Sequence, residues 1–248
     1  MKKERNGIVM NYGLQLYSVR DSASKDMDKT LREVAAMGYE FVEFAGFFNH
    51  PAEEIREMLE KYNLKVSGTH SPASGITPEN IEESIRYHKI IGCENYIIPG
   101  TDLKTGRKLS NFIALVNEAI PVFEAEGMKL HFHNHFSEFQ PNEDGRYAHY
   151  ELEKKTKINF EIDTYWSFFA GRDTLALLDR LKDRISVIHL KDGIGRAGKA
   201  LGEGNAPVLD VIAKAKELNL AMVVESEGLD PSGLEEVARC MEFLKKNG

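Results

Sequence analysis

The chain has 248 residues, of which 42% are hydrophobic and 29% charged, as in an ordinary globular protein. Its formal net charge of −7 offers no basic surface to nucleic acid phosphates, so we expect no nucleic acid partner. No stretch approaches the roughly 18 to 20 apolar residues of a membrane span, and no apolar run of signal-peptide length follows the charged N-terminus. With only two cysteines, Cys93 and Cys240, we expect a cytoplasmic protein without membrane or disulfide framework.

Strand-like and helix-like segments alternate along the whole chain. The apolar runs predict strands at about 10–19, 41–44, 64–70, 96–98, 130–135, 158–163, 185–190 and 220–225. Helical periodicity predicts helices at 25–37, 53–62, 78–91, 109–126, 149–155, 174–182, 207–218 and 231–246. Pro121 is expected to kink or split the fourth of these helices.

Eight strand–helix units in ~250 residues predict a (β/α)8 TIM barrel. A doubly wound open sheet is the alternative, although it would usually have fewer units for this length. No linker or shift in composition divides the chain, so residues 1–248 are expected to form one domain.

The fifth predicted strand carries three histidines at alternate positions, His131, His133 and His135. Side chains on a strand alternate between its two faces, so all three imidazoles should share one face. Imidazole binds metals and has a pKa suited to proton transfer near neutrality. The alternative is a polar strand whose histidines face water.

Polar side chains stand where nearly every predicted strand ends. In a TIM barrel, working groups lie at these C-terminal ends. The residues at these positions are Gln15, Glu43, His70, His133, His135, Asp163, His189 and Glu225. Four of them come from successive strands and predict one divalent metal site, namely His133, Asp163, His189 and Glu225. The two imidazoles favour Mn²⁺, Co²⁺, Zn²⁺ or Fe²⁺ over Mg²⁺, and the two carboxylates would balance the charge of the ion.

Each residue taken alone also has a structural interpretation. His70 or His189 could be a hydrogen-bonded structural histidine, and Asp163 could cap a following helix. Glu225 could be a carboxylate at a loop edge, and Glu43 could form a salt bridge with a lysine. Gln15 could form a hydrogen bond to groups at the rim of the barrel. Four consecutive strands that each end in a ligand-type residue favour the metal site.

The chain resembles the sugar-phosphate isomerase/epimerase family with the xylose-isomerase-like TIM barrel, whose superfamily also contains AP endonuclease-type barrels. Eight segments in order carry this resemblance, namely 13–21, 38–43, 68–70, 133–135, 162–166, 189–192, 201–204 and 224–225. The resemblance implies a metal held by the ends of strands five to eight and a sugar substrate whose adjacent oxygens bind that metal. It also implies glutamate ligands on strands five and eight. Glu225 matches, whereas His133 stands at the strand-five position, and His131 is an alternative alignment one step of ~6.5 Å deeper.

The expected reaction is proton transfer next to a carbonyl, through an enediolate stabilised by the metal acting as a Lewis acid. Glu225 or His135 would remove the proton, and His70 or His135 would return it. Lys191 would neutralise an oxyanion, unless it is a solvated lysine at the rim.

Gln15, Glu43, Trp166 and Glu203 are the candidate substrate-binding residues. Trp166 would form a wall against a sugar face, with packing under a loop as its alternative role. Glu203 stands between two glycines in a loop and would reach inward.

The predicted activity is a metal-dependent isomerase or epimerase acting on a ketose or a related polyol ketone. A dehydratase on the same site, an AP endonuclease-type phosphodiesterase and a non-catalytic sugar-binding barrel are the alternatives, and the acidic charge disfavours the phosphodiesterase. No glycine-rich phosphate cradle follows strand seven or eight, which slightly favours a free sugar over a sugar phosphate. A homo-oligomer is compatible with the sequence, which carries no signal for or against one.

Overall fold

The structure, a computed structural model, describes residues 12–247. Within them, eight parallel strands pair side by side and close into a barrel, since β6 pairs with β7, β7 with β9, and β9 with β1. The barrel strands are β1 (Tyr12–Gln15), β2 (Phe41–Ala45), β3 (Lys65–His70), β4 (Asn95–Ile98), β5 (Lys129–His133), β6 (Asn159–Asp163), β7 (Ile185–Ile194) and β9 (Ala221–Glu225). A ninth strand, β8 (Ala197–Lys199), runs antiparallel to the end of β7. The predicted single TIM barrel is confirmed for this part of the chain.

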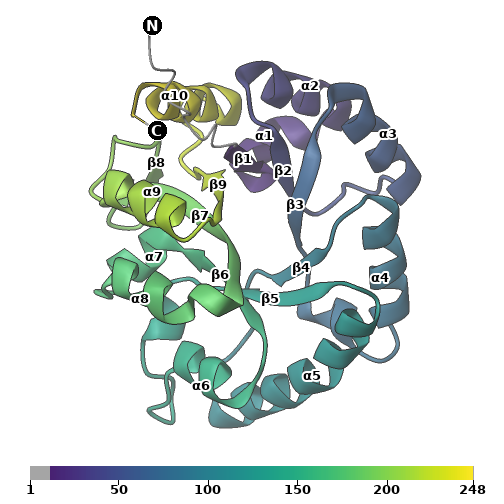
Figure 1. The fold of residues 1–248 in the computed structure, drawn as a ribbon, viewed down its shortest axis with the longest axis vertical. Helices are drawn as coiled ribbons and strands as arrows, with labels where there is room; N and C mark the ends of the chain where they lie inside the picture. The colour runs from purple at the N-terminus through teal and green to yellow at the C-terminus, as the bar shows by residue number, and fades with distance from the viewer. Residues whose placement is uncertain (1–11, 248) are drawn as a thin grey trace, which may run out of the picture.

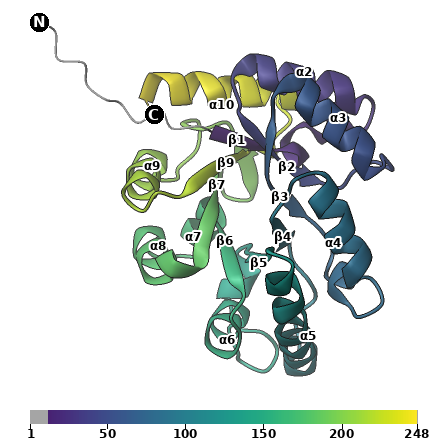
Figure 2. The ribbon, with the colours of Figure 1, turned by 45° about the vertical axis from the view of Figure 1, so that its right-hand side comes forward.

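The helices form an outer layer around these strands (Figure 1). They are α1 (Arg20–Ala23), α2 (Met27–Met37), α3 (Ala52–Tyr62), α4 (Ile81–Ile90), α5 (Gly106–Ala125), α6 (Ala148–Lys155), α7 (Thr164–Phe169), α8 (Thr174–Leu181), α9 (Val208–Glu217) and α10 (Gly233–Asn247). Figure 2 shows the last helix, α10, lying beside α2, so the outer layer closes as the barrel does. None of the helices in residues 12–247 combines the length and the apolar character that a membrane crossing requires.

The inside of the barrel is apolar at its base and polar at its C-terminal end. Ile97, Val187 and Val223 form a small buried cluster from β4, β7 and β9. Two residues further along β7 and β9, the same inward face carries His189 and Glu225, because side chains alternate with a period of two. The main core lies between the outward strand faces and the helices.

The boundaries differ from the predictions at several places. The fifth strand ends at His133, so His135, expected on the same strand face as His131 and His133, lies in the loop after it. The first strand ends at Gln15 rather than near Val19, because the Gln15 side chain accepts a hydrogen bond from the Tyr17 backbone N–H and begins a 3-10 helix over Leu16–Val19. Met10, where that strand was expected to begin, lies outside the described residues. The helix α5 is not split at Pro121 but runs through it to Ala125. The short helix α7, which follows β6 directly, was not predicted.

Candidate active site

Strand register places the predicted metal-binding residues next to one another. Asp163 of β6 is paired with His189 of β7, and Lys191 of β7 with Glu225 of β9. His133, Asp163, His189 and Glu225 are all buried, and each offers a ligand-type atom within 4.8 Å of those of the others. The structure therefore brings the four residues together in an arrangement that could hold a metal ion.

His133 and Asp163 both present unpaired polar atoms to this cluster. Neither ring nitrogen of His133 has a hydrogen-bond partner within residues 12–247, although the residue is only 1% exposed. Asp163 Oδ2 is also buried without such a partner, 3.7 Å from His133 Nε2. Burial lowers the pKa of His133 well below its ordinary value, so the imidazole is neutral and its lone pair is available. Because unpaired buried polar groups are costly, these atoms are suited to a metal ion.

Asp163 also caps helix α7. Its Oδ1 accepts a hydrogen bond of 2.8 Å from the Trp166 backbone N–H, which leaves Oδ2 for the cluster. The Asn134 side chain makes two hydrogen bonds with the Asp163 backbone. Asn134 Nδ2 donates to the Asp163 carbonyl, and Asn134 Oδ1 accepts from the Asp163 amide. The capping role considered for Asp163 and a role in the cluster therefore coexist.

Glu43 and Gln15 lie beneath His189 and hold it in place. His189 Nε2 lies 2.7 Å from Glu43 Oε1, and Gln15 Nε2 donates to the same oxygen over 2.6 Å. Metal-binding histidines commonly donate their second N–H to a carboxylate in this way. Burial opposes ionisation of Glu43, but His189 and His70 outweigh it and lower the pKa of Glu43 to about 2. Gln15 and Glu43 are fully buried, and the contacts that the structure shows for them are with other protein groups. Their binding of substrate stays a prediction.

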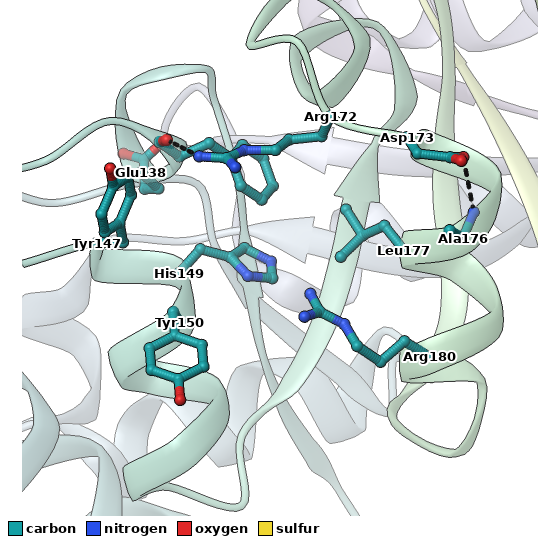
Figure 3. A pocket seen from close by; sticks show the side chains of 10 residues that line it. Glu138, Tyr147, His149, Tyr150, Arg172, Asp173, Ala176, Leu177 and Arg180 are labelled. Carbon is teal, nitrogen blue, oxygen red and sulfur yellow. Dashed lines mark hydrogen bonds between the residues drawn. The ribbon is translucent and has the colours of Figure 1, made fainter.

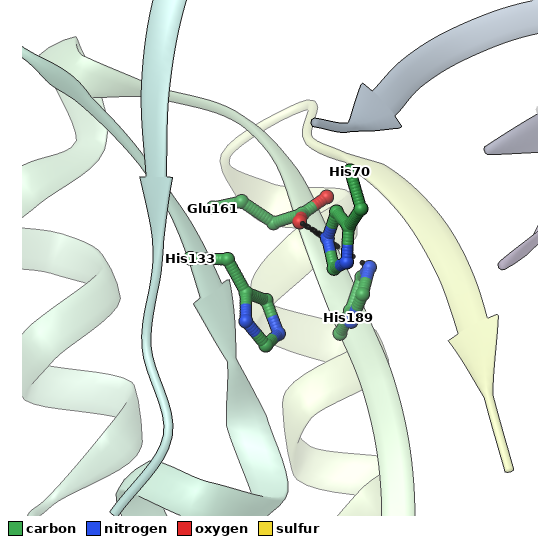
Figure 4. A group of neighbouring side chains, drawn as sticks. All are labelled: His70, His133, Glu161 and His189. Carbon is green, nitrogen blue, oxygen red and sulfur yellow. Dashed lines mark hydrogen bonds and ion pairs between the residues drawn. The ribbon is translucent and has the colours of Figure 1, made fainter. Parts of the chain in front are cut away.

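Glu161 joins the site as a residue that sequence reasoning missed. It precedes Asp163 by two positions and therefore shares its inward face. With His70, His133 and His189 it forms a second group of potential metal ligands (Figure 4). Glu161 Oε2 lies 2.8 Å from His70 Nε2. Burial and the nearby Glu43 raise the pKa of Glu161 well above its usual range, so Glu161 is the protonated member of the carboxyl pair.

Lys191 is a buried cation within the same cluster rather than a solvated lysine at the rim. Its Nζ donates to Glu225 Oε2 over 2.9 Å and to Glu227 Oε2 over 2.5 Å, and lies 3.6 Å from Asp163 Oδ2. Burial disfavours the charge, but Glu225 and Asp163 outweigh this and raise the pKa of Lys191. Lys191 and His189 in turn hold the pKa of Glu225 well below its ordinary value despite burial.

A cavity of about 690 Å³ opens over this cluster, at the C-terminal end of the barrel. His70, His133, His135, Glu225 and Glu227 are among the residues that line it. Among the described residues that line it there is no lysine or arginine. The mouth of the barrel thus joins imidazoles and carboxylates in a space of the size that small-molecule sites occupy.

Two further predicted residues lie outside this lining. The Trp166 ring packs near His135 at a centroid distance of 6.3 Å, with Lys191 Nζ 5.0 Å from the ring centre. Glu203 pairs instead with Arg239 of α10 over 2.8 Å, so the structure does not bring it to the cluster. His131 lies one layer deeper, with Nε2 3.0 Å from Asn95 Oδ1.

Comparison with known proteins identifies the family. A family model described as Xylose isomerase-like TIM barrel matches residues 31–247. The chain belongs to this family. Its predicted resemblance to sugar isomerases and epimerases is thereby confirmed at the level of the family.

Individual relatives of the family are similar to the chain but distant. A solved sugar phosphate isomerase/epimerase from Parabacteroides distasonis is 25% identical, with a TM-score of 0.84 over 96% of this chain and 98% of that one. A solved structure described as a probable 3-DHS dehydratase from Bacillus anthracis is 13% identical, with a TM-score of 0.77 over 96% of this chain and all of the other (100%). An inosose dehydratase from Geobacillus kaustophilus is 24% identical over 189 residues, or 66% of this chain. The match spans 61% of the length of that dehydratase.

Proposed function

We propose that the protein is a divalent-metal-dependent isomerase or epimerase that acts on a ketose or a related polyol ketone. The observation that carries the proposal is the buried, unpaired set of donor atoms on His133 and Asp163, next to His189 and Glu225. Membership of a family with sugar isomerases and epimerases supports the class of substrate.

His133, Asp163, His189 and Glu225 would hold the ion. When bound, the metal would supply Lewis-acid stabilisation of negative charge on neighbouring substrate oxygens. Two imidazoles and two carboxylates favour Mn²⁺, Co²⁺, Zn²⁺ or Fe²⁺ over Mg²⁺. Burial opposes the charge of His189, but the neighbouring carboxyl groups outweigh it and raise the pKa of His189 well above its ordinary value. The imidazole would therefore release a proton when it binds the ion, and Glu43 would accept its remaining ring N–H.

Glu225, His135 and His70 are the proposed proton-transfer groups. All three line the mouth cavity. Of the three, only His135 has a side chain that makes no hydrogen bond within residues 12–247. His135 is therefore free to take a proton from the carbon next to a substrate carbonyl. His70 contacts the protonated Glu161 and would return the proton to the substrate. Lys191 would stabilise the oxyanion that develops between these two steps.

The lining of the mouth favours an uncharged sugar over a sugar phosphate. Phosphate groups are usually held by arginine, lysine or a helix N-terminus. The lining residues include Glu225 and Glu227 and, within the described chain, no cation. Trp166 would limit the width of the site next to His135.

A dehydratase is the second candidate, and the 24% identity to an inosose dehydratase favours it. The same groups would remove a proton beside the carbonyl, after which a hydroxyl on the next carbon would leave as water with a proton from His70 or His135. The two reactions therefore share every residue and differ in the fate of one C–O bond.

Turnover in heavy water distinguishes the two reactions. Purified protein loaded with Mn²⁺ or Co²⁺ would be incubated with a panel of ketoses and polyol ketones in D₂O and the products analysed by mass spectrometry. An isomerase or epimerase gives a product that differs from the substrate formula only by one solvent deuterium on carbon, and is therefore one mass unit heavier. A dehydratase gives a product lighter by one water. Binding of sugar without turnover, equal in metal-free and metal-loaded protein, would contradict both and favour a sugar-binding barrel.

A further inference from the structure

A second cavity lies on the outer surface of the barrel, between α6 and α8. It has a volume of about 510 Å³, which is within the range of small-molecule sites. Figure 3 shows Tyr147, His149 and Tyr150 on one side of it and Leu177 and Arg180 on the other, with Arg172 above. Aromatic side chains and two arginines thus form much of the lining of this open cavity.

His149 is the buried polar group in its wall. Its imidazole is stacked between the rings of Phe139 and Phe160, at centroid distances of 4.5 and 4.6 Å. The residue is only 2% exposed, and Nε2 has no hydrogen-bond partner within residues 12–247. Burial, and then Arg180, Arg184 and Arg172, lower the pKa of His149 to about 3, so the ring is neutral. A neutral imidazole keeps one donor and one acceptor, and this one lacks a protein partner for Nε2.

Two arginines of the lining present guanidinium groups to the cavity. Arg172 has no carboxylate partner within residues 12–247; it donates to the Phe139 carbonyl and lies over the Phe139 and Tyr147 rings. Arg180 pairs with one carboxylate, Glu153, over 3.2 Å, and its side chain is 53% exposed.

Two carboxylates of the lining, Glu138 and Asp173, each accept a hydrogen bond from a backbone amide. Glu138 Oε2 accepts from the His135 amide over 2.8 Å, and Asp173 Oδ1 accepts from the Ala176 amide over 3.0 Å. The anionic group of a ligand would meet the guanidinium of Arg172, which has no carboxylate partner within residues 12–247, and a planar ring would meet aromatic faces.

We propose that this cavity binds a small organic anion that carries a planar ring. The ring would pack against Tyr147 and Tyr150, and the anionic group would lie between Arg172 and Arg180. The His149 ring, held between Phe139 and Phe160, would form part of the wall against which the ligand packs. A phosphate on a nucleoside and a carboxylate on an aromatic ring both have this chemistry, and they are distinguished below.

The position of the cavity connects it to the mouth of the barrel. Residues 134–139 pass from the end of β5 to the cavity, with His135 facing the mouth and Phe139 facing the cavity. Glu138 lines the cavity and holds the backbone of His135. A ligand that displaces Glu138 would consequently change the position of His135.

Calorimetric titration of the full chain tests the proposal with four probes, namely adenosine 5′-monophosphate, benzoate, adenosine and inorganic phosphate. We expect one of the two ring-bearing anions to bind about tenfold or more tightly than adenosine or phosphate alone. Tighter binding of the nucleotide assigns the phosphate chemistry, and tighter binding of benzoate assigns the carboxylate chemistry.

Three variants locate the binding. Arg180→Gln should weaken it by about tenfold or more, because the exposed guanidinium is lost without a change in the core. Ala176→Trp places a large ring in the cavity from an exposed helix position and should abolish binding. Arg86→Gln is the matched control, since Arg86 is similarly exposed (59%) and paired with a glutamate on α4, and it should leave binding within about twofold.

Absence of binding by both ring-bearing anions would overturn the proposal. So would binding that survives both Arg180→Gln and Ala176→Trp, because the probe would then lie elsewhere, as in the mouth of the barrel. Equal affinity for the ring-bearing anions and inorganic phosphate would exclude the role of the ring. None of these outcomes depends on whether the barrel is an isomerase.

Discussion

Lys191 places a fixed positive charge among the carboxylates that the proposed metal would also bind. Its ammonium group is 2.9 Å from Glu225 and 3.6 Å from Asp163, and the residue is only 1% exposed. In the protein without metal, Lys191 compensates these buried charges. With metal, the same ammonium competes with the ion for the two carboxylates and lowers its affinity.

Lys191→Met is therefore expected to lower stability without metal and to increase the stabilisation that metal provides. Loss of one partner of a buried ion pair costs roughly 3–5 kcal/mol, and a divalent ion would restore the missing charge. Thermal unfolding with and without Mn²⁺ or Co²⁺ measures both effects. Lys61→Met, which breaks an exposed pair with Asp28, is the control and should change stability much less. An equal increase in Tm on metal addition to Lys191→Met and to the original protein would contradict this account.

The chemistry of individual strand ends was predictable from sequence, but their contacts were only partly so. Alternation along β6 places Glu161 on the same face as Asp163, and the same rule applied to β9 leads from Glu225 to Glu227. The alternation of side chains thus indicated Glu161 and Glu227, but the prediction considered only the residues at the strand ends. The ion pair of Glu203 with Arg239 had no signal, because it joins a loop to a helix 36 positions further along the chain.

At the scale of elements, helix α5 shows how tertiary packing overrides a local rule. Proline removes the bond to the carbonyl four residues earlier, here that of Asn117, and should interrupt a helix. Nevertheless α5 continues through Pro121 for one more turn, where Phe123 is fully buried against the core. Burial of an aromatic side chain contributes about 1.5–3 kcal/mol, comparable to the cost of the proline.

Pro121→Ala should stabilise the protein by about 1–3 kcal/mol, because the substitution restores a helical hydrogen bond at an exposed position. Urea denaturation measures the change. Glu124→Ala, another exposed position of the same helix, should shift the midpoint much less. A decrease in stability in Pro121→Ala would show that the helix depends on the restriction that proline places on the unfolded chain.

Other elements were predictable to the extent that their pattern was periodic. The eight barrel strands and their eight covering helices follow from hydrophobic runs of ordinary length. Helix α7 has only six residues and begins directly at Asp163, so no full period of apolar residues indicates it. The extension of β7 into a hairpin with β8 depends on Asp192, whose carboxylate accepts from the backbone amides of Gly202, Gly204 and Ala206.

At the scale of the whole molecule, the barrel buries several histidines in neutral form. Burial lowers the pKa of His70, His88 and His131 to about 4 each. His88 lies on α4, away from the barrel mouth, between the Thr69 hydroxyl and the Ser84 carbonyl. In the unfolded chain a histidine titrates near its ordinary pKa of about 6.5.

These histidines should make the protein sensitive to acid. Between pH 6.5 and about 4 the unfolded chain binds protons that the folded chain excludes, so the free energy of unfolding falls as the pH falls. The contribution is fully present above pH 6.5 and is lost through this window. His88→Gln should reduce the slope of stability against pH between about 6.5 and 4, measured by denaturation at several pH values. An unchanged slope would indicate that folding does not lower the pKa of His88.

The central claim is that His133, Asp163, His189 and Glu225 hold one divalent metal ion at the mouth of the barrel. Elemental analysis of purified protein, after dialysis against metal-free buffer, tests it most directly. We predict about one Mn, Co, Zn or Fe per chain in the original protein and in His131→Gln, which alters a buried histidine of the same strand outside the cluster. Asp163→Ala and His189→Ala should retain little or no metal while circular dichroism shows a folded barrel. Undiminished metal content in these two folded variants would contradict the proposed site.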